Sequence, residues 1–172
     1  FELLTKLYHH LLNKIDDSKQ MIIMGDSAGG QIALAFAQQL KKDSEPQPSH
    51  IVLISPVLDA TFSNPEARKY EKEDPMLGIE GSKYLVNLWA GDAPLDHYKL
   101  SPMYGDLEDL GHITITTGTK ETLYPDAVKF STMLNEKGIN HEFIPGYSLF
   151  HIYPIFPIPE RERFLEQLKR II

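Results

Sequence analysis

Cysteine is absent from this chain, which therefore has neither a disulfide framework nor a cysteine-ligated metal site. No apolar run approaches membrane-spanning length, so we expect no membrane segment. The 17 basic residues form no stripe and are outnumbered by 24 acidic ones, which gives a formal net charge of −7. We therefore expect no nucleic-acid partner. The histidines show no metal-ligand spacing and no H-E-x-x-H motif, so neither a metal nor a cofactor is expected.

The remaining composition is that of an ordinary globular domain, with 172 residues of which 42% are hydrophobic. We expect one domain over 1–172 and, because cysteine is missing, a cytoplasmic location. An oligomer is compatible with this composition. The chain opens within an amphipathic helix, so we expect a piece of a longer protein whose native N-terminus and signal peptide the sequence leaves open. The expected apolar face of that helix consists of Phe1, Leu4, Tyr8, Leu11 and Ile15.

Short apolar runs alternate with helical patterns along the chain. The predicted strands are 21–24, 51–54, 113–116 and 141–144, and the predicted helices include 1–13, 81–89, 125–138 and a last helix from 159. This alternation favours an α/β fold with a parallel sheet of about four strands and helices on both faces. Residues 59–109 are too long for a plain crossover, and we interpret them as an insert with a functional role.

The most informative motif is Gly25-Asp26-Ser27-Ala28-Gly29, between a predicted strand and a predicted helix. A serine in this setting is typical of a nucleophile elbow. Side chains at positions −2 and +2 are expected to collide in such a turn, so glycine is expected at both. The hydroxyl of Ser27 would lie at a helix N-terminus, where the Ala28 N–H could receive an oxyanion. A phosphate-binding glycine loop is the rival interpretation, but its motifs are missing here.

A nucleophilic serine needs a base and an orienting acid, which follow it along the chain in the order acid, then histidine. After the strand 113–116, two carboxylates compete for the acid role. We favour Glu121, which lies in the loop, over Asp126, which falls in the first turn of the next helix and suits the helix dipole. His151 is the histidine in the loop after the last predicted strand, and we predict that it is the base.

Several motifs in a fixed order resemble the hormone-sensitive-lipase-type family of α/β-hydrolases. They are the elbow with Gly30, then Ser55-Pro56-Val57-Leu58-Asp59, Asp74-Pro75-Met76-Leu77, Leu100 to Leu107, Gly118 to Leu123, and His151-Ile152-Tyr153-Pro154. The resemblance covers essentially the whole chain. It implies an α/β-hydrolase domain, incomplete at its N-terminus, in which residues 59–109 form a cap-like insert over the site.

The resemblance also implies roles for individual residues. The family's nucleophile falls on Ser27 and its histidine on His151, whereas the family more often has aspartate where Glu121 stands. The family's His-Gly-Gly-Gly stretch, which supplies most of its oxyanion hole, is absent from this chain. Only the Ala28 donor would remain, so we expect the full-length parent to be active and this piece alone to be poorly active. The first predicted strand would then be an uncovered sheet edge.

The function that these observations favour is hydrolysis of carboxylic esters of small or short-chain acyl groups by a Ser-His-Glu triad, with a small ester as the partner. One alternative is a non-catalytic protein that binds a small molecule on the same fold, because a fold does not fix a function. Another alternative is a peptidase or amidase, which would use the same residues. The sequence identifies neither the physiological substrate nor its acyl-chain length.

Overall fold

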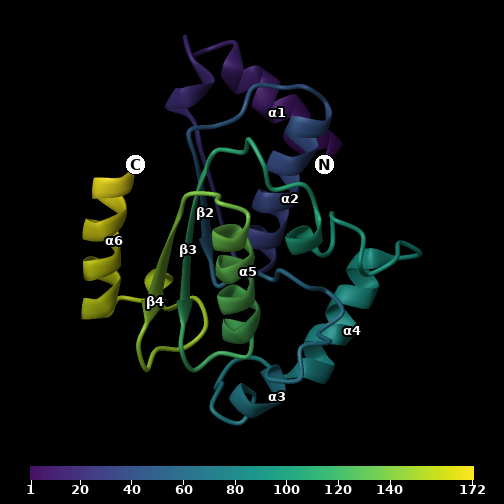
Figure 1. Ribbon diagram of the computed structural model, residues 1–172, viewed down its shortest axis with the longest axis vertical. Coiled ribbons are helices and arrows are strands. Elements are labelled where there is room, and N and C mark those ends of the chain that lie inside the picture. Colours follow the sequence, from purple (N-terminus) through teal and green to yellow (C-terminus); the bar gives the residue numbers. More distant parts are fainter.

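The core of the protein is a four-stranded parallel sheet with the strand order β1-β2-β3-β4, seen in a computed structural model that describes residues 1–172 (Figure 1). The strands are β1 (Ile22–Asp26), β2 (His50–Ile54), β3 (His112–Gly118) and β4 (His141–Gly146). All three strand pairs are parallel. The predicted fold class is therefore confirmed, and the carboxyl ends of the four strands lie at one edge of the sheet.

Helices cover both faces of this sheet. Helices α2 (Ala28–Lys42) and α5 (Tyr124–Glu136) lie on one face, and α6 (Pro159–Ile171) lies on the other (Figure 1). Helix α1 (Glu2–Leu12) packs on the outside of α2. This arrangement follows from crossover connections between parallel strands, which place helices over the sheet faces.

Side-chain alternation along β2 explains why the sheet is buried on both sides. Ile51 and Leu53 join the large core cluster under α2 and α5, whereas Val52 and Ile54 pack with Phe164 of α6. Successive side chains of a strand point to opposite faces, so a strand covered on both sides needs an unbroken apolar run. The continuous run at 51–54 is therefore the signature of a central parallel strand.

The segment 59–109 lies between β2 and β3 and holds α3 (Ala67–Tyr70), α4 (Ile79–Ala90) and a 3₁₀ turn at Pro102–Tyr104. It is anchored to α2 by buried amides, because Gln31 Nε2 donates to the Leu100 carbonyl and Gln38 Nε2 donates to the Pro102 carbonyl. A small apolar cluster joins α3 and α4 to the ends of the sheet; its buried members are Val57, Phe62, Ala67, Ile79 and Leu123.

The structure corrects several predicted boundaries. Strands β1 and β4 run two residues further than expected, because Gly25, Asp26, Pro145 and Gly146 pair with the neighbouring strand but carry no apolar signal. The short helix α3 and the 3₁₀ turns were not predicted, because single turns are too short to show periodicity.

The predicted apolar face of α1 was wrong at two positions, Leu11 and Ile15, and Ile15 lies beyond the last helical residue, Leu12. Leu11 is 40% exposed, and Leu12 packs instead against the cluster that contains Tyr8 and Phe36. Burial raises the pKa of Tyr8 to about 12, helped by the nearby charge of Glu45.

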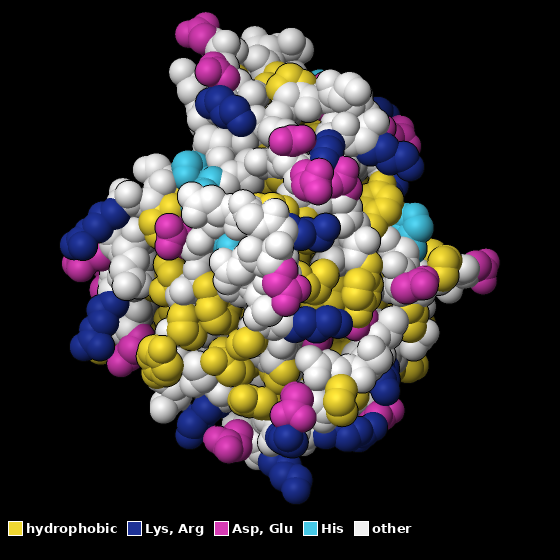
Figure 2. All heavy atoms as spheres, in the orientation of Figure 1, with side chains coloured by type: hydrophobic (Ala, Val, Ile, Leu, Met, Phe, Trp, Pro, Cys, Tyr) yellow, Lys and Arg dark blue, Asp and Glu magenta, His cyan; other side chains and the backbone are white.

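Strand β1 is one edge of the sheet, and its side chains on the α6 face remain open. Ile22 is 41% exposed and Met24 is 50% exposed. On the face of the molecule drawn in Figure 2, acidic and basic side chains are interspersed among apolar ones. None of the helices combines the length and apolar character needed to cross a membrane.

Candidate active site

Ser27 occupies a sharp turn between β1 and α2. Its backbone angles are φ 53° and ψ −118°, a conformation that non-glycine residues rarely adopt. The end of β2 holds the turn in place, because the Ser27 N–H donates to the Ile54 carbonyl at 2.8 Å and the Val57 N–H donates to the Ser27 carbonyl at 3.1 Å. The surrounding structure thus maintains a strained residue, as is common at functional sites.

The glycines around Ser27 differ in how much space they have. A Cβ on Gly25 would lie 2.1 Å from the backbone oxygen of Gly29, so position −2 requires glycine. A Cβ on Gly29 would meet nothing closer than Asp26 Oδ1 at 3.8 Å, so the predicted collision at position +2 was wrong. The second crowded position is Gly30, whose Cβ would lie 2.8 Å from Pro56 Cβ. The elbow is crowded where α2 crosses the chain leaving β2.

His151 lies between Ser27 and Glu121. Its Nε2 is 3.0 Å from Ser27 Oγ, and its Nδ1 is 3.2 Å from Glu121 Oε2. An ionised carboxylate only accepts hydrogen bonds, so Nδ1 carries the proton that faces Glu121. In a neutral imidazole Nε2 then has a free lone pair, which accepts from the Ser27 hydroxyl. The structure thus brings the three predicted residues into one hydrogen-bonded row.

Glu121 is fully buried in the loop after β3 and accepts from three side chains. Besides His151, these are Ser55, which donates to Oε2 at 2.8 Å, and Thr117, which donates to Oε1. A buried carboxylate is tolerated when donors satisfy it in this way. Sequence reasoning missed Ser55 and Thr117. Their position at the carboxyl ends of β2 and β3, the edge where the site lies, was the available signal.

Asp126, the other candidate acid, is occupied elsewhere. It lies in the first turn of α5, is 3% exposed, and its Oδ1 accepts from Asn64 Nδ2 at 2.8 Å. Burial raises the pKa of the Asp126 carboxyl. Its side chain makes no hydrogen bond with His151, so of the two carboxylates only Glu121 faces the imidazole.

The loops that carry Glu121 and His151 are bonded to each other. The Thr119 N–H donates to the Gly146 carbonyl at 2.9 Å, and the Lys120 N–H donates to the Leu149 carbonyl at 3.0 Å. The contact is so close that a Cβ on Gly118 would lie 2.4 Å from the Leu149 oxygen. Backbone contacts therefore fix the distance between the acid and the histidine.

The Ala28 N–H is the first amide of α2 and donates to no other group of the chain. Amides in the first turn of a helix have no intrahelical acceptor, and they lie at the positive end of the helix dipole. Ala28 directly follows Ser27, so its N–H can donate a hydrogen bond to an anionic oxygen of a group attached to Ser27 Oγ. Asp26, on the other side of Ser27, is exposed.

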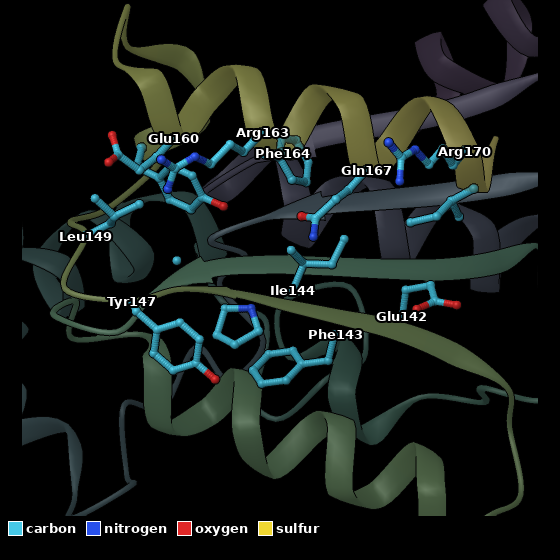
Figure 3. A pocket seen from close by; sticks show the side chains of 14 residues that line it. Glu142, Phe143, Ile144, Tyr147, Leu149, Glu160, Arg163, Phe164, Gln167 and Arg170 are labelled. Atoms are coloured by element: carbon cyan, nitrogen blue, oxygen red, sulfur yellow. The ribbon is translucent and has the colours of Figure 1, made fainter.

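A cavity of about 710 Å³ lies on another part of the surface, between β4 and α6 (Figure 3). Arg163 and Arg170 of α6 and Ile144 of β4 are among its lining residues, whereas Ser27 and His151 are not. The serine site is therefore separate from this groove. No group of three or more histidine, cysteine, aspartate or glutamate side chains is arranged to hold a metal ion.

Comparisons with known proteins agree with this geometry. Residues 1–155 match the family model described as alpha/beta hydrolase fold. The chain is 32% identical over 166 residues to an esterase of Acinetobacter venetianus, covering 94% of this chain and 54% of that protein. A crystal structure from Staphylococcus aureus has a TM-score of 0.94 and 29% identity, over 98% of this chain and 57% of that chain.

An esterase from the bacterial hormone-sensitive lipase family has a TM-score of 0.90 and 25% identity, over 95% of this chain and 56% of that chain. The chain thus spans about half the length of the relatives it matches. The parallel sheet, the strained elbow and the family match over 1–155 lead to one assignment. The chain belongs to the α/β-hydrolase family and resembles its hormone-sensitive-lipase-type esterases.

Proposed function

We propose that this chain carries the reacting residues of a serine hydrolase that cleaves carboxylic esters of small or short-chain acyl groups. One observation carries the proposal: the hydrogen-bonded row from Ser27 Oγ through the His151 imidazole to Glu121 Oε2, with separations of 3.0 and 3.2 Å. A serine hydroxyl is weakly nucleophilic unless a positioned base removes its proton.

In the first half of the reaction, Ser27 Oγ attacks the ester carbonyl carbon while His151 Nε2 takes the hydroxyl proton. The carbonyl oxygen becomes an oxyanion and accepts from the Ala28 N–H. Glu121 holds the imidazole in the required tautomer and stabilises its cationic form. His151 then gives the proton to the leaving alcohol oxygen as its bond to carbon breaks, which leaves an acyl group on Ser27.

In the second half, water replaces the alcohol. His151 Nε2 takes a proton from the water as its oxygen attacks the acyl carbon, and the Ala28 N–H donates to the second oxyanion. The bond to Ser27 Oγ breaks, the proton returns from His151 to that oxygen, and the carboxylic acid leaves. These steps use three side chains and one backbone amide of this chain.

We also propose that residues 59–109 act as a cap beside this site. The cluster formed by Val57, Phe62, Ala67, Ile79 and Leu123 supports this role. Two members of this cluster are close to the site. The Val57 N–H donates to the Ser27 carbonyl, and Leu123 lies two residues after Glu121. Apolar packing against Val57 and Leu123 would hold the cap rigidly against the loops that carry the reacting residues.

The test compares ester and amide turnover by single-site variants. We expect the chain to release p-nitrophenol from p-nitrophenyl acetate and butyrate faster than it cleaves matched p-nitroanilides. Ser27→Ala should abolish the release, whereas Ser82→Ala on α4 should retain it. Equal turnover by Ser27→Ala would contradict the nucleophile assignment. Faster amide cleavage would indicate a peptidase or amidase, and tight ligand binding without turnover would indicate a binding protein.

A further inference from the structure

We infer that Ser55 is a positioning residue that holds the acid and the histidine loop in register with the nucleophile. The inference rests on the proposed function of Ser27, His151 and Glu121. Ser55 is the first residue after β2, is fully buried, and has a backbone φ of 45°. This left-handed conformation is uncommon for a residue other than glycine.

The hydrogen bonds of Ser55 have only one consistent direction. The Ile152 N–H can only donate, so Ser55 Oγ accepts that bond at 2.9 Å. The single hydroxyl proton of Ser55 is then directed to Glu121 Oε2 at 2.8 Å. One oxygen atom therefore connects the carboxylate to the backbone of the histidine loop.

Both contacts act on the reacting row itself. The carboxylate oxygen that accepts from Ser55 is the same Oε2 that faces His151 Nδ1. Ile152 directly follows His151 and has a φ of 51°, an outlier for a β-branched residue. The Ser55 oxygen satisfies the N–H of this strained residue, and that contact fixes the backbone from which the imidazole projects.

The backbone of Ser55 connects the same parts of the site. Its N–H donates to the Thr116 carbonyl of β3 at 2.7 Å, and the preceding Ile54 carbonyl accepts from the Ser27 N–H. The elbow, the acid loop and the histidine loop therefore all meet at this residue. Thr117 is different, because its hydroxyl contacts Glu121 and not the histidine loop.

The experiment measures covalent labelling of Ser27 by a fluorophosphonate in the 172-residue chain, with the inactivation rate constant separated from the binding constant of the reagent. Ser55→Ala removes the hydroxyl. Ser55→Gly removes it and also relieves the positive φ, so it should melt at a higher temperature than Ser55→Ala.

Ser101→Ala is the matched control for these variants. Ser101 is also fully buried, and its Oγ accepts from the Ala60 N–H at 2.8 Å and donates to the Leu95 carbonyl at 2.6 Å. It therefore joins two loops in the same manner as Ser55, but it has no contact with Glu121 or His151. Its loss should lower the melting temperature and leave labelling unchanged.

We expect both Ser55 variants to lower the inactivation rate constant about 10- to 100-fold, the effect of leaving a buried donor unpaired, with the reagent's binding constant unchanged. Their rates should be equal although their melting temperatures differ. The inference would be overturned if the wild-type chain is labelled and Ser55→Ala is labelled at the same rate. It would also be overturned if the inactivation rate constant of Ser55→Gly recovers together with its melting temperature. A wild-type chain that is not labelled at Ser27 would instead overturn the proposed function.

Discussion

Substituting alanine for Gly25 is expected to displace the nucleophile. The added Cβ would lie 2.1 and 2.2 Å from the oxygen and carbon of Gly29 and 2.7 Å from the nitrogen of Gly30. All three are backbone atoms, so β1 and the first turn of α2 must move apart to relieve the overlap. A shift of about 1 Å between reacting groups costs on the order of 100-fold in rate.

Alanine at Gly29, four positions along, provides the matched comparison. Its Cβ would have 3.8 Å to the nearest atom, and alanine is favoured over glycine in a helix by about 1 kcal/mol. Fluorophosphonate labelling of Ser27 should therefore slow by about 100-fold in Gly25→Ala and change by less than about fivefold in Gly29→Ala. Equal rates in the two variants would refute the steric reasoning.

Three further predictions follow from the site and its surroundings. Glu121→Gln keeps the shape of the acid but removes its charge and replaces one accepting oxygen with a donating NH2 group, so the His151 tautomer is no longer fixed and ester turnover should fall by roughly 10⁴-fold; a loss below tenfold would contradict the acid role. Because burial raises the pKa of Asp126, its ionised form destabilises the fold, and this cost appears as pH rises above the ordinary carboxyl value. Asp126→Asn, to which Asn64 can still donate, should therefore raise the melting temperature at pH 7 by about 2–4 °C, with little change at pH 3; a lower value at pH 7 would contradict this. The chain offers the Ala28 amide as an oxyanion donor and has no His-Gly-Gly-Gly stretch. Its ester turnover should therefore lie about 10²- to 10³-fold below that of a longer form carrying one more oxyanion donor. Equal turnover by the two forms would contradict the need for a second donor.

Patterns that depend on neighbouring residues predicted most of the fold. The apolar runs located all four strands, and the strand–serine–helix context located the strained turn at Ser27. The loop positions of Glu121 and His151 were predicted because parallel strands bring their carboxyl ends to one edge. The roles of these residues, the cap role of 59–109, the cytoplasmic location, and the absence of nucleic-acid partners stay predictions.

Contacts between distant residues could not be predicted in the same way. Ser55 and Glu121 are 66 positions apart, and Asn64 and Asp126 are 62 apart, so no local pattern relates them. The crowding at Gly30 depends on Pro56, which reaches the elbow only when β1 and β2 pair. Tertiary packing decides these features.

The most direct test of the proposed triad is to locate the residue that an active-site phosphonate modifies, by peptide mapping of the labelled chain. One phosphonyl group should be found on Ser27, none should be found in Ser27→Ala, and removing the His151 imidazole should slow the reaction by several orders of magnitude. The adduct on another serine, or an undiminished adduct in Ser27→Ala, would contradict the account.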